Sequence, residues 1–390
     1  ASDGNAIFLD SAGYFLDFIE MPMAIYHWAT GTYIPWMATD WKLTPTTFTV
    51  HLRKTSNLSD GSVFTSRDVL TTFNVKRLLS DQVWSYIDKV TAPDAHTVVF
   101  HMSTPATVVQ YLVLRMNIRA DSTYSHFGTQ VQQLVNAGKT MDSPEAKALR
   151  LELNQYRPAA MVACGPFKFD PNSQITSGQI TLVKNIGCWA ANQVQFDKIV
   201  DYNGETAAIT PLILKKDIDY ATQAFPPDTE RAIISKGIGI VRPPLGSGPA
   251  IYINFKKVPD LVSAQARQAL AYAINRDQAA TVSLGLSAKS CKYMAGISDS
   301  LAGGWVDSAD LAKLNNYALD VAKAASMLTT LGFKKGSDGV YVGPSGAKMD
   351  FTLEVPAEYT DWSATAQNVA EQLTAFGFKI TVKPVTYTQE

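Results

Sequence analysis

Two aromatic side chains that could hold a ligand lie close together in the segment 355–362, which reads Val-Pro-Ala-Glu-Tyr-Thr-Asp-Trp. Tyr359 and Trp362 stand on either side of Thr360 and Asp361. An aromatic ring can stack on an apolar ligand face, and polar groups nearby can bond a hydroxylated rim. These residue types therefore predict non-covalent binding rather than a reaction.

The same segment also has a purely structural interpretation. Trp362 can pack as the first apolar residue of the helix that follows, in the manner of a hydrophobic staple. Asp361 can cap that helix by accepting its N–H groups, which is the interpretation that we favour for this residue. For Tyr359 and Trp362 the binding and the structural interpretations both stay open.

The residue types that catalyse reactions form no recognisable constellation in this sequence. The five histidines are scattered, and no pair has the HExxH spacing of a zinc enzyme. His96 and His101 flank a predicted strand, and their spacing directs them to opposite faces. The sequence has neither a GxSxG nucleophile elbow nor a P-loop. We therefore expect no enzyme activity, no metal site and no cofactor.

Length and charge narrow the function classes further. The chain of 390 residues exceeds one comfortable hydrophobic core, so two or more lobes are expected. Its 34 basic and 35 acidic side chains give a formal charge of −1, which offers no basic footprint for nucleic acid or an anionic membrane. No run approaches the roughly 20 apolar residues of a membrane span. The N-terminus lacks a charged-then-apolar signal, so we expect that any export signal has been removed.

The three cysteines are too few for a disulfide scaffold and lack CxxC spacing. Cys164 and Cys188 flank strand-like segments that could be neighbours in a hairpin, so a disulfide in an oxidising compartment is one interpretation. The other is that both, together with Cys291, are buried apolar side chains. The sequence leaves this choice open.

The elements that must position a site can be read from periodicity and capping residues. Alternating apolar residues over 48–52 predict a half-buried strand, and Ser-Asp-Gly at 59–61 predicts a tight turn. Thr65 and Asp68 have the spacing of a capping box at the start of a helix with one apolar face. We also expect strands at 198–202 and 251–253, helices at 143–156, 207–214 and 264–274, and a break at the proline- and glycine-rich run 243–249.

Towards the C-terminus the pattern reads strand, helix, strand. The strands are expected at 348–355 and 378–385, and the helix at 363–376 is closed by Gly377. Such a unit predicts parallel strands joined by a right-handed crossover. The segment 355–362 then lies at the carboxyl end of a strand, where ligands bind in open α/β sheets.

Four motifs occur in the order found in one protein family. The segment 48–75 resembles the signature region of the family 5 extracellular solute-binding proteins, which are receptors of ABC importers for peptides, nickel and oligosaccharides. Cys-Gly-Pro-Phe-Lys-Phe at 164–169 resembles the family's GPY/F strand, and Lys-Lys-Asp-Ile-Asp at 215–219 resembles its G-x-I-D loop. Residues 266–277, ARQALAYAINRD, are similar to its VRQALAYAIDRD helix. The resemblance covers most of the chain.

The resemblance implies a two-lobed α/β fold of the periplasmic-binding-protein type (type II, cluster C), with mixed sheets flanked by helices. It assigns residues 1–43 and 162–245 to the core of lobe I, 44–161 to an extra subdomain of lobe I, and 246–390 to lobe II. The crossing between the lobes would fall at 243–249. Because family members carry an earlier strand and a further C-terminal region, we expect the chain to be shortened at both ends, with lobe II incomplete.

The resemblance also implies a set of ligand-binding residues. The motif at 359–362 resembles the GWTDW loop of the family's cello- and chito-oligosaccharide binders, in which an aromatic ring stacks on a sugar face. Tyr359 stands where those relatives have Trp, which keeps a flat ring and leaves the sugar unspecified. The resemblance places Phe225 and Gln223 in the cleft, and Asn254 in a strand where it would orient the hinge backbone or the ligand. Ordinary structural roles are also open for these three residues.

Together these observations predict a receptor that closes two lobes around a β-linked gluco- or chito-oligosaccharide and delivers it to an ABC import permease. The resemblance implies a monomer outside the cytoplasm, either periplasmic or a cell-surface lipoprotein. An oligopeptide receptor is the main alternative, because the general motifs do not encode the ligand class, and nickel is disfavoured by the scattered histidines. A glycoside hydrolase is a distant alternative, since Glu358 and Asp361 in one loop would hardly face each other across a glycosidic bond.

Overall fold

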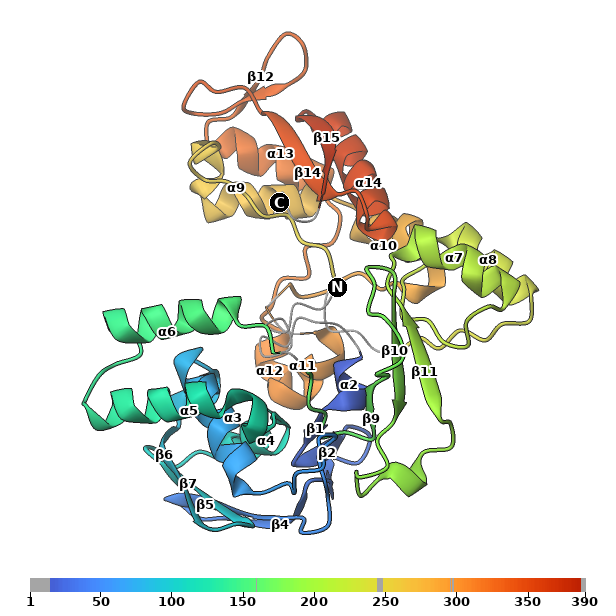
Figure 1. The fold of residues 1–390 in the computed structure, drawn as a ribbon. Helices are drawn as coiled ribbons and strands as arrows, with labels where there is room; N and C mark the ends of the chain where they lie inside the picture. Colours follow the sequence, from blue (N-terminus) through green and yellow to red (C-terminus); the bar gives the residue numbers. More distant parts are fainter. Residues whose placement is uncertain (1–14, 159, 244–247, 295, 297, 387–390) are drawn as a thin grey trace. The chain divides into compact units, whose positions relative to one another are not determined.

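Helices and sheets alternate along the chain (Figure 1), which confirms the predicted α/β class. Within the described residues five sheets are antiparallel, and the pair β14-β15 is parallel. The computed structural model describes residues 15–158, 160–243, 248–294, 296 and 298–386. Backbone contacts divide the chain into two compact units, which we call unit 1 (Ala1–Asn203) and unit 2 (Gly204–Glu390). The assignment of 1–43 and 162–245 to one lobe core stays a prediction.

Unit 1 contains a four-stranded antiparallel sheet of order β4-β5-β7-β6. Its strands are β4 (Ala38–Leu43), β5 (Thr47–Leu52), β6 (Ile87–Asp94) and β7 (Thr97–Met102). The predicted strand at 48–52 is confirmed as β5, in which Phe48, Val50 and Leu52 are buried. Because successive side chains of a strand point to opposite faces, these three residues all join the main core of unit 1.

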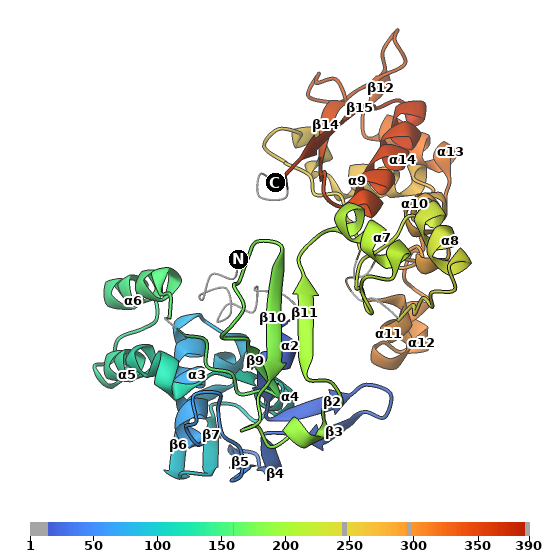
Figure 2. The same cartoon turned by 45° about the vertical axis from the view of Figure 1, so that its right-hand side comes forward.

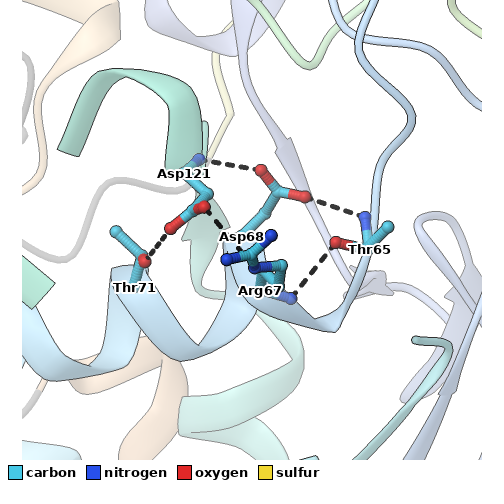
Figure 3. Close-up of polar contacts among 5 residues, drawn as sticks. All are labelled: Thr65, Arg67, Asp68, Thr71 and Asp121. Atoms are coloured by element: carbon cyan, nitrogen blue, oxygen red, sulfur yellow. Dashed lines mark hydrogen bonds and ion pairs between the residues drawn. The ribbon is translucent and has the colours of Figure 1, made fainter. Parts of the chain in front are cut away.

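Helix α3 (Ser66–Leu78) begins at the predicted capping box, which is confirmed. The N–H of Thr65 donates to one carboxylate oxygen of Asp68 at 2.8 Å (Figure 3). The other carboxylate oxygen accepts the N–H of Asp121 at 2.8 Å, at the start of α5 (Asp121–Asn136). One buried carboxylate therefore caps α3 and also joins it to α5.

Smaller sheets and helices complete unit 1. Strands β1 and β8 pair with each other, β2 pairs with β3, and a three-stranded antiparallel sheet has the order β11-β10-β9. The predicted helix at 143–156 and strand at 198–202 are confirmed as α6 and β11. The bounds are α2 (Leu16–Ile19), β1 (Met21–Pro22), β2 (Ala24–His27), β3 (Thr32–Pro35), η1 (Gln82–Ser85), α4 (Val108–Leu114), β8 (Asn117–Ile118), α6 (Pro144–Gln155), β9 (Phe167–Phe169), β10 (Gln179–Lys184), η2 (Ala191–Gln193) and β11 (Lys198–Tyr202).

Gly165, in the motif that precedes β9, is required by a close approach of two backbone segments. A Cβ at this position would lie 2.5 Å from the carbonyl oxygen of Phe18 and 2.7 Å from the carbonyl carbon of Ile19. The Gly165 N–H also donates to the Ile19 carbonyl at 2.8 Å. Glycine is therefore the residue that lets this segment lie against the end of α2.

All three cysteines are free thiols. Cys164 and Cys188 are buried in the main core of unit 1, so the apolar interpretation is confirmed for these two residues rather than a disulfide between them. Burial raises the pKa of both thiols, which keeps them protonated at neutral pH. Cys291 is exposed, so the expectation that it is buried is wrong.

Unit 2 contains the predicted strand-helix-strand unit. Strand β14 (Asp350–Pro356) pairs in parallel with β15 (Lys379–Val385), and α14 (Thr360–Phe376) connects them, which confirms the predicted pairing. Gly377, with φ of +124°, ends α14 as predicted. The helix begins three residues earlier than predicted, so Trp362 lies inside its first turn.

The other helices of unit 2 include α7 and α9, which confirm the predictions at 207–214 and 264–274. The bounds are α7 (Thr206–Lys215), α8 (Pro227–Ser235), η3 (Pro259–Val262), α9 (Ala264–Ala273), α10 (Arg276–Leu284), η4 (Gly285–Ser287), α11 (Asp299–Trp305), α12 (Ser308–Leu311), α13 (Val321–Thr330), β12 (Lys334–Lys335) and β13 (Tyr341–Val342).

The predicted strand at 251–253 is wrong, because these residues form no strand. A strand needs a neighbour that receives its N–H and C=O groups, and no strand in the described residues pairs with this segment. Tyr252 in its middle is 92% exposed. Part of the predicted break at 243–249 falls on residues 244–247, which lie outside the described residues.

Arg276, near the end of the motif at 266–277, fixes two distant segments of unit 2. Its guanidinium donates to the carbonyls of Cys291 at 3.1 Å, Asn316 at 2.7 Å and Tyr317 at 2.9 Å. A planar fork of donors suits several acceptors at once, which a lysine ammonium would not match. The motif therefore has a structural role in addition to forming a helix.

Candidate ligand-binding site

The two rings predicted to bind a ligand lie just beyond the carboxyl end of β14. Tyr359 is the N-cap residue of α14, with extended backbone, and Trp362 belongs to the first turn. The ring centroids are 5.3 Å apart, the planes meet at 64°, and both side chains are partly buried. Because the rings pack edge to face, a flat ligand could cover the face of one ring but not of both.

Asp361 lies inside the first turn of α14 and is not the N-cap residue, so the capping role that we favoured is wrong in this detail. Its carboxylate accepts its own N–H and that of Trp362, as acidic groups do in a first turn. Burial outweighs these bonds and raises the pKa of the carboxyl group. Ser283 donates its hydroxyl to the backbone carbonyl of Asp361 at 2.8 Å, which holds the turn in place.

Thr360 is a candidate residue that sequence reasoning missed. Its hydroxyl oxygen is buried and has no hydrogen-bond partner in the part of the chain that the structure describes. An unsatisfied buried hydroxyl costs about 1–3 kcal/mol, so a ligand or a water that bonds to it is favoured. The signal in the sequence was the position of a hydroxyl residue between two rings.

Gln223 and Phe225 lie in the segment before α8, and both have structural contacts. The Gln223 amide nitrogen donates to the Gly204 carbonyl at 3.1 Å, while its amide oxygen is buried and has no partner among the described residues. Phe225 packs on a small core formed by α7 and α8. Gln223 therefore keeps one group that a ligand could bond, whereas Phe225 is largely used in packing.

The C-terminal end of α10 links the two candidate segments within unit 2. Ser283, in the last turn of α10, contacts Asp361. Just beyond it, Gly285 lies so close to Pro227 that an added Cβ would be 3.2 Å from the proline side chain. Figure 2 shows α10 beside both α8 and α14. The segment before α8 and the segment before α14 therefore both lie near one end of α10.

An ionic network between a buried glutamate and an exposed arginine, also missed from the sequence, fixes α8 at this position. Glu230 of α8 is 7% exposed and forms an ion pair with Arg242. Ser287 of η4 donates its hydroxyl to Glu230 at 2.6 Å and accepts from the Arg242 Nε at 2.8 Å. These contacts join α8 to the segment that follows α10.

Asn254 is exposed and lies in a turn rather than in the expected strand. Its side-chain oxygen accepts the N–H groups of Lys256 at 3.2 Å and Lys257 at 3.3 Å. Asparagine is suited to this task because its side chain can bond the backbone two residues ahead. Its proposed contact with a ligand stays a prediction.

The candidate site thus offers two rings, a hydroxyl, an amide oxygen and a partly buried carboxylate, which are groups that bind organic ligands. Within the described ranges, His, Cys, Asp and Glu side chains form no group of three or more that could hold a metal ion. Over the same ranges, none of the helices has the length and apolar character needed to cross a membrane.

Three comparisons with known proteins bear on these observations. A crystal structure of a periplasmic oligopeptide-binding protein of Thermotoga maritima with bound mannohexaose has a TM-score of 0.78 and 21% identity, covering 99% of this chain and 70% of that chain. The Bacillus subtilis oligopeptide-binding protein AppA, in complex with a nonapeptide, has a TM-score of 0.71 and 18% identity, covering 97% of this chain and 71% of that chain. These similarities confirm the predicted periplasmic-binding-protein fold.

Sequence comparison identifies the family. A Deinococcus radiodurans protein with the name "Probable ABC transporter-binding protein" is 34% identical over 86 residues, which are 22% of this chain and 14% of that protein. Residues 32–390 match the family of bacterial extracellular solute-binding proteins, family 5 Middle. Because this match includes all but the first 31 residues, the chain belongs to the family 5 bacterial extracellular solute-binding proteins.

Proposed function

We propose that this chain is an extracytoplasmic receptor that captures an oligosaccharide and delivers it to an ABC import permease. Family membership supports the role of a receptor. The observation that carries the choice of ligand is the partly exposed ring pair Tyr359 and Trp362 beside the unpartnered hydroxyl of Thr360. Sugars present apolar C–H faces and a polar rim, which complement a ring face surrounded by polar groups.

In the proposed complex one ring face stacks on a sugar ring, and sugar hydroxyls bond the polar atoms that have no partner in the described residues. These atoms are the hydroxyl oxygen of Thr360 and the amide oxygen of Gln223. Each such bond removes a penalty of about 1–3 kcal/mol, so these groups favour a hydroxyl-rich ligand. The proposal includes lobe closure, since a ligand shifts the population towards the arrangement with which it makes more contacts.

An oligopeptide receptor is the second candidate, and Asp361 is the observation that favours it. Burial raises the pKa of this carboxyl group, and among the described residues no cationic side chain forms an ion pair with it. The terminal ammonium of a peptide would supply the missing opposite charge. Solved proteins of the same fold hold mannohexaose in one case and a nonapeptide in the other, so both ligand classes are compatible with the architecture.

Calorimetric titration of the 390-residue protein with cello-, chito- and manno-oligosaccharides, and with a panel of oligopeptides, tests the proposal. Trp362→Ala or Tyr359→Ala should weaken sugar binding by roughly 1–3 kcal/mol, as expected for an aromatic anchor. Trp305→Ala provides a matched control, because Trp305 is 73% exposed and lies outside both candidate segments. Unchanged sugar affinity in the double variant of Tyr359 and Trp362, with a native circular dichroism spectrum, would refute the sugar assignment.

Asp361→Asn separates the two ligand classes. The variant should keep its sugar affinity if rings and hydroxyls dominate, whereas a peptide anchored by its ammonium would lose most of its affinity with the charge. The proposal also assigns binding without hydrolysis. New reducing ends after prolonged incubation with oligosaccharides would contradict that part of it.

A further inference from the structure

An open surface cavity of about 550 Å³, six of whose ten lining residues are exposed, lies in unit 1, far along the sequence from the candidate ligand site. It lies where β4 begins, where β5 ends and where β6 turns into β7, at one end of the four-stranded sheet. Of the ten residues that line it, nine have polar or charged side chains, and Leu52 is the exception. Its volume lies within the range of small-molecule sites and exceeds what a simple ion fills.

The two carboxylates in the wall already have partners. One Asp40 oxygen lies 2.5 Å from the His51 Nδ1, and the other accepts the Thr39 hydroxyl at 3.0 Å. Asp94 accepts the N–H of His96 at 2.7 Å. These bonds lower the pKa of both carboxyl groups, so both are ionised and satisfied at neutral pH.

The cationic and donor groups in the wall, in contrast to the carboxylates, have hydrogen-bonding atoms without partners. Lys54 forms neither an ion pair nor a hydrogen bond with any described residue. Toward the described residues the Arg53 guanidinium donates through its Nε alone, to the Trp36 carbonyl at 2.9 Å. Its guanidinium carbon lies 3.7 Å from the centre of the Trp189 ring. The Nδ1 of His96 is buried without a partner in the described part of the chain. A stacked guanidinium and an ammonium thus have donors to offer, while the acceptors nearby are taken.

Helix α3 holds the wall of the cavity in place at this end of the sheet. The Ser66 N–H donates to the Ala95 carbonyl at 2.8 Å, and the Ser66 hydroxyl donates to the Asp94 carbonyl at 2.8 Å. The N-terminus of this helix therefore abuts the turn between β6 and β7, which forms part of the cavity wall. The partial positive charge of the helix N-terminus is met by the capping carboxylate of Asp68, so the proposed site depends on the side chains in the wall.

We propose that this cavity binds a small organic molecule that carries an oxyanion, a carboxylate or a phosphate monoester. The oxyanion would accept from Lys54, from the terminal nitrogens of Arg53 and from His96. The rest of such a ligand would meet threonine hydroxyls and the polar backbone of the sheet end. This assignment is independent of the ring pair in unit 2 and of the ligand class proposed for it.

Titration of the 390-residue protein with citrate and with glucose 6-phosphate tests the proposal, and glucose serves as the uncharged counterpart of the phosphate ester. In the double variant Tyr359→Ala and Trp362→Ala, which lacks the proposed sugar platform, we expect saturable binding of at least one oxyanion and none of glucose. Loss of one charge-assisted contact in Lys54→Gln should weaken that binding about tenfold. His96→Phe keeps a flat ring, removes the buried nitrogen and should also weaken binding. Citrate binding would identify a carboxylate site, and glucose 6-phosphate binding a phosphate site.

Lys42→Gln is the matched control, since Lys42 is exposed on β4 of the same sheet and does not line the cavity. The affinity of the Lys42→Gln variant for the oxyanion should stay within about twofold of that of the wild type. Equal weakening in Lys42→Gln and Lys54→Gln would point to diffuse charge attraction and overturn the site. Absence of saturable binding by both oxyanions would also overturn it. Retention of oxyanion binding in Tyr359→Ala separates this result from any failure of the proposed sugar site.

Discussion

Asp68→Asn is expected to break the link between α3 and α5 in unit 1. Asp68 is 3% exposed, and its two oxygens accept the N–H groups of Thr65 and Asp121, each at 2.8 Å. Asparagine has one oxygen, so its amide nitrogen must face one of these two N–H donors. The substitution therefore removes a charge-assisted bond and leaves a buried N–H without an acceptor.

The expected change in the free energy of unfolding combines these two losses with one gain. A hydrogen bond to a charged group contributes about 1.5–3 kcal/mol, and a stranded buried donor costs about 1–3 kcal/mol. The gain is that the variant no longer buries a carboxylate, whose desolvation is the largest influence that raises the pKa of Asp68. We therefore expect the free energy of unfolding to fall by a net ~2–4 kcal/mol.

The raised pKa of Asp68 also sets a pH dependence. Folded unit 1 binds this proton more tightly than the unfolded chain, in which the pKa is near 3.8. The stability that arises from this difference is fully present below pH 3.8 and is lost as the pH rises through the pKa of the folded state. Asp68→Asn should lack this decline, so the two proteins should differ in the slope of stability against pH above 3.8.

Urea unfolding followed by tryptophan fluorescence and circular dichroism measures the effect. The Trp84 indole N–H donates to the Phe73 carbonyl of α3 at 3.0 Å, so Trp84 contributes to the fluorescence change when this helix unfolds. Asp142→Asn is the control, because Asp142 is exposed, and its stability should stay within about 0.5 kcal/mol of the wild type. If Asp68→Asn shifts the transition no more than this control does, the reasoning about Asp68 is refuted.

Two further predictions concern packing in unit 1. Gly165→Ala should lower the free energy of unfolding by about 2–4 kcal/mol, since the new methyl group would lie 2.5 Å from the Phe18 carbonyl oxygen. Gly178→Ala is the control in thermal unfolding, because no atom lies within 4 Å of the added Cβ. Equal unfolding midpoints of the two variants would contradict the close approach at Gly165. A colorimetric thiol reagent should modify only the exposed Cys291 in the native protein and all three cysteines after denaturation. A single reactive thiol in the denatured, unreduced protein would instead reveal a disulfide.

The sequence determined the elements whose causes lie within a few positions. The strand at 48–52 follows from alternation alone, and the start of α3 follows from the spacing of Thr65 and Asp68. The parallel pairing of β14 with β15 follows from the helical pattern between them, because a crossover helix brings the second strand back alongside the first. The family resemblance depends on the same kind of local motif, which is why it too could be read from the sequence.

Only the tertiary structure decided where distant groups meet. Residues 251–253 have side chains that favour a strand, but no strand lies beside them in the described residues. A strand forms only when a neighbouring strand accepts and donates its backbone hydrogen bonds. Arg276 receives its acceptors from residues up to 41 positions away, and the second N–H bound by Asp68 comes from 53 positions away.

The candidate sites show the same division. The sequence indicated Tyr359, Trp362 and Asp361 by type and spacing, but the edge-to-face packing of the rings and the burial of Asp361 depend on neighbours supplied by the fold. Residues from several separate strands and turns line the cavity in unit 1, so no local sequence pattern could predict it. Local chemistry determines how a segment folds, whereas burial and hydrogen-bond partners depend on which segments the whole chain brings together.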